Sequence, residues 1–153
     1  MIRGRCEIRM VAIKQISIFV ENKPGRMARV AKTLSDAGVN IRALTIAEAG
    51  DFGVIRMVVD NTEKGYRVLH DKGFTVSETD VLAVELKDVP GGLYEVAHTL
   101  GMNNVNVDYA YAFVTAKAGR AMLILRVDDI KRAAHVLSEA GVRIATKEEI
   151  QEI

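Results

Sequence analysis

The sequence contains a single cysteine, no tryptophan and only two prolines. One thiol, that of Cys6, can form neither an intrachain disulfide nor a cluster of thiolate metal ligands. The scarcity of cysteine favours an intracellular, cytoplasmic protein. No apolar run approaches the roughly 20 residues that cross a bilayer, and the segment from Met1 to Arg9 is too charged for a signal peptide. We therefore expect no membrane partner.

The chain also has no large excess of positive or negative residues, since its formal net charge is +1. A near-neutral chain gives no reason to expect nucleic acid as a partner. The three histidines, His70, His98 and His135, lie far apart in the sequence, so we expect no metal site and no cofactor. The common nucleotide-binding and hydrolase motifs are missing, and no nucleophile and base stand out as a set. The sequence thus favours a protein that is not an enzyme.

The two prolines mark an internal repeat. Lys23-Pro24-Gly25-Arg26-Met27 returns as Val89-Pro90-Gly91-Gly92-Leu93, which is 66 residues later. The match runs without a gap to Asn40 and Asn106, and after a two-residue slip it resumes with Asp60 on Asp128. A unit of about 65 residues is too long for one solenoid repeat and long enough for a modest core. The sequence predicts two tandem domains, 13–78 and 81–150, after an N-terminal extension at 1–12.

Hydrophobic periodicity predicts the elements of the first copy. Residues 16–20 alternate as a strand. An apolar stripe with helical spacing predicts a helix from Pro24 to about Gly38, with Met27, Val30, Ala31 and Leu34 on its inner face. Strands are expected at 39–48 and 54–59, then a helix capped by Asp60 or Asn61, then a strand at 74–77.

The second copy repeats this order, with strands expected at 81–87, 105–115, 121–127 and 143–146. Its helices are expected after Pro90 and after Asp128 or Asp129. Each copy is therefore an α+β unit of βαββαβ order, which predicts a ferredoxin-like fold: an antiparallel four-stranded sheet with two helices on one face. Val58, Met122 and Ile124 would lie on the open face of such a sheet. We expect another domain or subunit to cover them, and so at least a homodimer.

The residues around the first proline resemble a known signature. The stretch from Phe19 to Met27, followed by Ala37-Gly38-Val39-Asn40-Ile41, is similar to ACT domains. The resemblance extends from about 13 to 150 and implies regulatory modules that bind amino acids at interfaces between paired domains. Two features depart from the family pattern: Val20 and Leu86 stand where some members have histidine, and Asn104 replaces Gly38. By position, the resemblance implies these ligand-binding residues: Asn22, Pro24, Gly25, Arg26, Met27 and Asn40, and Asp88, Pro90, Gly91, Gly92, Leu93 and Asn106.

Elementary chemistry supports the same residues. The first turn of a helix offers unpaired N–H groups and a partial positive charge to a carboxylate, and glycines let a ligand approach the backbone. The side chain of Asn22 or Asp88 can accept a hydrogen bond from an ammonium group, while Asn40 or Asn106 would come from a neighbouring domain. Each of these residues is also an ordinary turn or cap residue, so a purely structural role remains an alternative.

Three classes of function can be weighed on this basis. The favoured hypothesis is a regulatory module that binds a free L-amino acid and modulates a partner, such as an enzyme of amino-acid metabolism. The alternative is an assembly protein built from ACT domains without a ligand. An enzyme on a ferredoxin-like frame is the third and least supported class.

Overall fold

The computed structural model describes residues 11–113 and 119–152. The chain divides into two compact units, one from Lys14 to Thr79 and one formed by Asp80 onward with the start of the chain up to Ile13. Residues 1–10 of the expected extension lie outside the described residues, whereas Val11 packs against the core of the second unit. In the described part of the chain no helix is both long and apolar enough to span a membrane.

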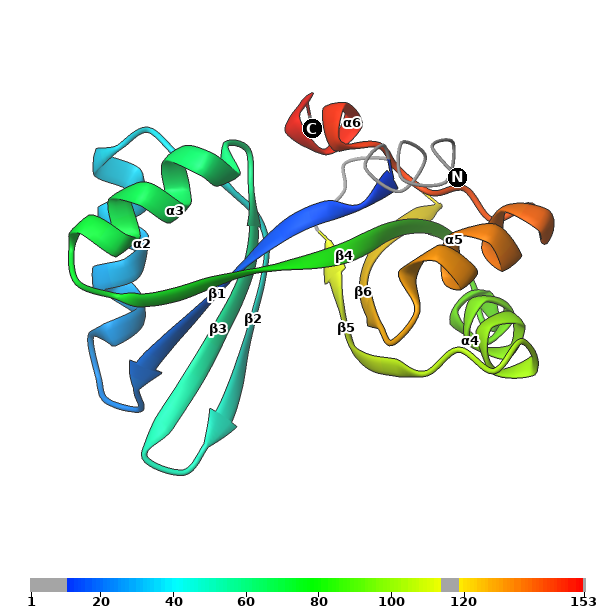
Figure 1. Ribbon diagram of the computed structural model, residues 1–153, viewed down its shortest axis with the longest axis horizontal. Helices are drawn as coiled ribbons and strands as arrows, with labels where there is room; N and C mark the ends of the chain where they lie inside the picture. Colours follow the sequence, from blue (N-terminus) through cyan, green and yellow to red (C-terminus); the bar gives the residue numbers. More distant parts are fainter. Residues whose placement is uncertain (1–10, 114–118, 153) are drawn as a thin grey trace. The chain divides into compact units, whose positions relative to one another are not determined.

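The first unit contains three antiparallel strands in the order β1–β3–β2. The helices α2 and α3 cover one face of this ladder (Figure 1). The apolar stripe of α2 and the inward residues of the strands form one core, which includes Ile16, Ile18, Val30, Leu34, Ile55, Met57 and Leu69. The elements are β1 (Ile13–Glu21), α2 (Arg26–Asp36), β2 (Ile41–Ala49), β3 (Phe52–Val59) and α3 (Thr62–Asp71).

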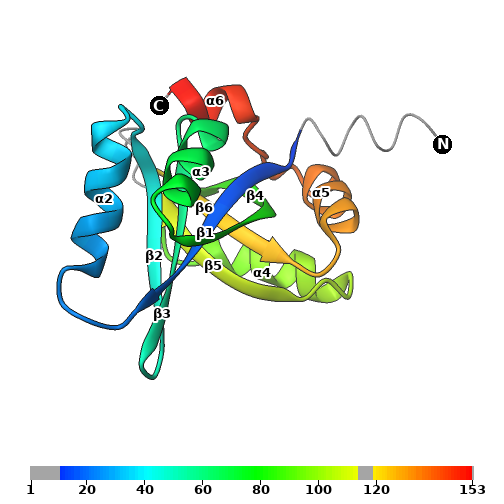
Figure 2. The same cartoon turned by 60° about the vertical axis from the view of Figure 1, so that its left-hand side comes forward.

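The second unit repeats the arrangement with strands in the order β4–β6–β5. Its helices are α4 and α5, and a short helix, α6, follows them (Figure 2). Leu82, Val84, Val96, Leu100, Leu125 and Leu137 belong to its core, at positions that repeat those of the first unit. The elements are β4 (Thr75–Lys87), α4 (Gly92–Met102), β5 (Val107–Phe113), β6 (Arg120–Val127), α5 (Ile130–Glu139) and α6 (Lys147–Glu152).

The strands at the ends of the two copies differ from the prediction. We expected separate strands at 74–77 and 81–87, but Thr75–Lys87 is one unbroken strand, β4. We also expected a strand at 143–146, and there Ile144 forms only an isolated antiparallel bridge with Val84. The α+β content and the βαββα order of each copy are as predicted, whereas a four-stranded sheet in each copy is not specifically supported.

Helix α2 begins two residues later than its predicted start at Pro24, and α4 begins after Pro90 as expected. Pro24 and Pro90 lie in turns, and α2 and α4 begin at Arg26 and Gly92. The residue before each helix is a glycine with positive φ, 86° at Gly25 and 91° at Gly91. Since this conformation is easy only for glycine, it accounts for the Pro-Gly pair in both copies.

The residues expected on an open sheet face are buried. Val58 and Ile124 have no exposed surface, and Met122 is 7% exposed. These three side chains therefore give no reason of their own for the chain to form a dimer.

Candidate functional site

The loop between β1 and α2 is fastened to the turn between β2 and β3. The Asn22 N–H donates to the carbonyl oxygen of Asp51 at 2.8 Å, and Asn22 Nδ2 donates to that of Gly50 at 3.1 Å. The amide nitrogen of Asn22 thus has a structural role that the sequence did not reveal. Its oxygen is the part of the side chain that could accept from a ligand.

Charged side chains surround this first loop. Lys23 Nζ lies 2.9 Å from Glu21 Oε2, and Arg26 Nη2 lies 3.4 Å from the same oxygen. The hydrogen bond from Lys23 contributes most to lowering the pKa of Glu21, with Arg26 adding to the effect. The single negative charge of Glu21 therefore balances only one of the two positive charges of Lys23 and Arg26. The start of α2 keeps a net positive charge.

Helices α2 and α4 begin without a side-chain cap, whereas the other long helix of each copy has one. Gly25 and Gly91 have no side chain to accept from the first turn. By contrast, Asn61 Oδ1 accepts from the N–H of Lys64 in α3, and Asp129 Oδ1 from that of Arg132 in α5, both at 3.1 Å. The first turns of α2 and α4 thus keep backbone donors that a ligand could use.

The loop of the second copy has the same backbone pattern. The N–H of Asp88 donates to the carbonyl oxygen of Gly119 at 3.1 Å, as Asn22 does to Asp51. The N–H of Gly92 donates to Val89 O at 3.0 Å. We expected glycine at position 92 to let a ligand approach the backbone. The structure shows another reason for glycine there: a Cβ would overlap the carbonyl oxygen of Lys87.

The other two predicted residues, Asn40 and Asn106, lie beyond the far ends of α2 and α4. Each of these helices has 11 residues and so spans about 16 Å. The backbone of Asn40 forms a reciprocal clamp with Asp60: the Asn40 N–H donates to Asp60 Oδ1, and the Asp60 N–H donates to Asn40 O, both at 3.0 Å. Asn106 and Asp128 repeat the clamp. Within one copy the structure therefore does not bring this Asn to the Pro-Gly loop.

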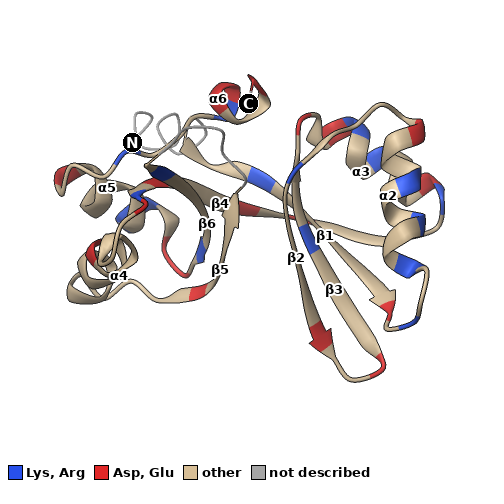
Figure 3. Cartoon of the chain, turned by 180° about the vertical axis from the view of Figure 1, so that it is seen from behind, with Lys and Arg blue, Asp and Glu red and all other residues tan. Residues whose placement is uncertain are grey.

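The two helix starts carry opposite charges. In the first copy Lys23, Arg26 and Arg29 outnumber Glu21, and the beginning of α2 is coloured by basic residues in Figure 3. In the second copy Lys87 is outnumbered by Asp88 and Glu95, which stand in place of Asn22 and Arg29. Lys87 Nζ lies 4.0 Å from Glu95 Oε2. A carboxylate would therefore be attracted to the start of α2 more than to that of α4.

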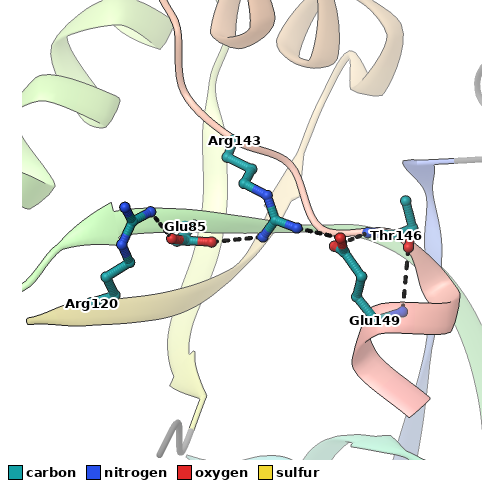
Figure 4. A network of polar contacts seen from close by, with 5 residues as sticks. All are labelled: Glu85, Arg120, Arg143, Thr146 and Glu149. Carbon is teal, nitrogen blue, oxygen red and sulfur yellow. Dashed lines mark hydrogen bonds and ion pairs between the residues drawn. The ribbon is translucent and has the colours of Figure 1, made fainter. Parts of the chain in front are cut away.

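Sequence reasoning missed a polar network in the second unit, drawn in Figure 4. Glu85, whose side chain is only 9% exposed, accepts from Arg120 and, at 2.7 Å, from Arg143. The hydrogen bond from Arg120 is the largest effect on this carboxylate; together with Arg143 it lowers the pKa of Glu85, although burial opposes the change. The hydrogen bond to Glu85, with the nearby charge of Glu149, raises the pKa of Arg143.

Arg143 also donates to Glu149, which belongs to a capping box at the start of α6. Glu149 Oε2 accepts from the N–H of Thr146 at 3.0 Å, and Thr146 Oγ1 accepts from the N–H of Glu149 at 3.3 Å. The Thr-x-x-Glu spacing at 146–149 was the sequence signal for this helix. The ion pair between Glu85 of β4 and Arg120 of β6 depends on the strand register, which the sequence does not state.

Comparisons with known proteins agree with the duplicated architecture. A protein-family model described as "ACT domain pair" matches residues 11–153. The crystal structure of protein BT0572 from Bacteroides thetaiotaomicron has 33% sequence identity and a TM-score of 0.89. That alignment covers 95% of this chain and 99% of the other. None of the curated protein sequences matches.

More distant solved structures share the fold. The ligand-free regulatory subunit of aspartate kinase from Thermus thermophilus has 14% identity and a TM-score of 0.63, covering 86% of this chain and 93% of that chain. The corresponding subunit from Thermus flavus has 14% identity and a TM-score of 0.58, with coverages of 86% and 94%. The resemblance predicted from the residues around the two prolines is confirmed: the chain belongs to the family of ACT domain pairs.

Proposed function

We propose that this chain is a regulatory module that binds a free L-amino acid at an interface between paired ACT domains. The carboxylate binds the backbone N–H groups at the start of α2 or α4, and the ammonium group lies near Asn22 or Asp88. Asn40 or Asn106 comes from a neighbouring ACT domain, since each lies about one helix length from the loop of its own copy.

One observation carries this proposal: the helices with the Pro-Gly loops, α2 and α4, lack a side-chain cap, and their partners α3 and α5 have one. A capping side chain at that position would add only a few tenths of a kcal/mol over glycine, and the positive φ of Gly25 and Gly91 itself favours glycine. The N–H groups of Arg26 and Gly92 donate to Lys23 O and Val89 O, and the rest of each uncapped first turn offers its donors to an anion. The excess of basic residues at α2 favours the first loop as the stronger carboxylate site.

The regulated partner is proposed by analogy with the fold neighbours, which are regulatory subunits of aspartate kinase. We propose an enzyme of amino-acid metabolism as the partner, with binding of the amino acid changing how the module docks on it.

The test is a thermal-shift screen of the twenty amino acids, followed by calorimetry with any that stabilises the chain. Asn22→Ala should weaken binding by about 1 to 3 kcal/mol, because it removes the acceptor for the ammonium group. Asn22→Asp is the matched control, since it keeps an acceptor and reproduces the residue of the second copy. If no amino acid at millimolar concentration stabilises the chain, the proposal is wrong.

A second candidate, a ligand-free assembly protein, is favoured by apolar side chains on the surface. Phe19 and Phe52 are 54% and 57% exposed, and Leu93 and Tyr94 are exposed in the first turn of α4. On this alternative the chain forms at least a homodimer through these residues. Sedimentation equilibrium of the wild type and of Phe19→Ser at micromolar concentration separates the two cases: a dimer that dissociates on this substitution and binds no amino acid supports assembly alone.

A further inference from the structure

A hollow of about 410 Å³ lies within the second unit. It is bounded by the end of β4, the first turns of α4, the start of β6 and the turn that follows α5. Its apolar lining is formed by Leu86, Val96 and Val142, and glycines at 92, 119 and 141 keep other parts of the wall free of side chains. Small-molecule pockets have volumes of about 300 to 1,000 Å³, so this one suits a molecule of amino-acid size.

The first copy carries larger side chains at the corresponding positions. Arg26 stands where the second copy has Gly92, and Phe74 where it has Val142. Arg29, the counterpart of Glu95, lies over the ring of Phe74, with its guanidinium carbon 5.0 Å from the ring centroid. The space that Gly92 and Val142 leave in the second copy is therefore a feature of that copy.

Charged groups of both signs line the same hollow. Arg120 and Arg143, with side chains 62% and 49% exposed, both donate to Glu85. Arg143 also donates to Glu149 through its second terminal nitrogen. A guanidinium group has five N–H donors in a fixed fork, so Arg120 keeps more donors for a second carboxylate than Arg143 does. Lys87 and Glu95 also line the hollow, and at 4.0 Å their exposed ion pair is weak. Opposite charges beside an apolar wall suit a zwitterion with an apolar side chain.

We propose that this hollow is a second amino-acid site, contained within one ACT domain. It binds the carboxylate of a free amino acid through Arg120 and Arg143 and the ammonium group through Glu95. The apolar side chain of the ligand packs on Leu86, Val96 and Val142. This inference rests on the ligand class of the proposed function and shares the start of α4 with it through Gly92, but it requires neither the N–H groups of α2 nor an Asn from a neighbouring domain.

Amide NMR of the full chain titrated with L-leucine tests the proposal. The amide signals of Gly92, Gly119 and Gly141 should shift with one saturable curve. Val142→Phe places the side chain of the first copy in the hollow and should weaken this binding at least tenfold, and Arg120→Gln should also weaken it. Lys131→Gln, an exposed change on α5 away from the hollow, is the control and should leave the curve unchanged.

Two analogues test recognition of the zwitterion. Leucinamide lacks the carboxylate and 4-methylpentanoate lacks the ammonium group, and both should bind at least tenfold more weakly than L-leucine. Saturable shifts confined to residues 22–27, or to residues 88–93 without Gly119 and Gly141, would overturn this site and leave the proposed function standing. Shifts confined to the hollow would support the site and count against binding at α2. No saturable shift at the three glycines would overturn the hollow as a site.

Discussion

The Cα of Gly92 faces the carbonyl oxygen of Lys87 so closely that a Cβ on Gly92 would overlap this oxygen. The absence of a side chain at Gly92 thus allows the end of β4 and the first turn of α4 to approach each other closely. Arg26 occupies the matching position of the first copy, so the two loops share a sequence pattern but differ in this close backbone contact.

Gly92→Ala should lower the free energy of unfolding by about 1 to 3 kcal/mol, because the loop must move to accept the methyl group. Gly101→Ala is the control within the same helix, where a Cβ would meet nothing within 4 Å. That change should raise the free energy by roughly 0.5 to 1 kcal/mol, because alanine favours the helix. Urea titrations measure both, and a stabilising Gly92→Ala would contradict the prediction.

The side-chain caps of α3 and α5 should each contribute about the same amount to the free energy of unfolding. Asn61→Ala and Asp129→Ala each remove the acceptor for an N–H of the first turn. Each should cost about 0.5 to 2 kcal/mol of unfolding free energy, with no loss of amino-acid binding. Calorimetric unfolding and the ligand screen together check this, and equal losses of stability and affinity would show that these helices belong to the site.

Stability should depend on pH through Glu85. Its pKa in the folded protein is lowered by Arg120 and Arg143, so it contributes stability above the ordinary carboxyl value of about 4.3 and loses that contribution as the pH falls through the lowered pKa. Glu85→Gln should therefore cost about 1 to 3 kcal/mol at pH 7. The difference from the wild type should shrink below pH 4. A difference that stays constant from pH 7 to pH 3 would mean that the carboxylate is not stabilised by the two arginines.

The capping box should hold α6 in place. Thr146→Ala removes a side-chain acceptor at the start of this six-residue helix. Amide exchange at residues 147–152 should become faster, while α5 keeps its protection, because so short a helix depends on its cap and its contacts. Thr146→Ser keeps the hydroxyl and should exchange as the wild type does.

Local patterns predicted most of the first copy's helix and strand order. The stripe of α2 is correct for Val30 and Leu34, which are buried, and wrong for Met27, which is 44% exposed. Met27 lies in the first turn, where the helix extends beyond the core, and Leu93 repeats this exposure in α4. Periodicity identifies a helical face but does not state where the core beneath it ends.

The rest depended on contacts between distant residues. The repeat placed Thr79 and Asp80 between the two copies, and the two compact units divide there, but the repeat did not reveal that β4 continues through them as one strand. The Asn22 bond to Gly50 and the two bonds from arginines to Glu85 join residues at least 28 positions apart. The hollow requires that Gly92 and Val142 line the same space. No spacing rule expresses these coincidences, whereas the cap residues at 61 and 129 are local and were among the predicted alternatives.

The Asn–Asp clamps also bear on how fast the two copies can fold. The clamp between Asn40 and Asp60 closes a segment of 20 residues, and the one between Asn106 and Asp128 closes 22. The two-residue slip of the repeat lies inside the second segment. Closure entropy grows with the logarithm of length, so the two extra residues change its cost by only about 0.1 kcal/mol. The cost of closing the two hairpins therefore gives no reason for one copy to fold ahead of the other.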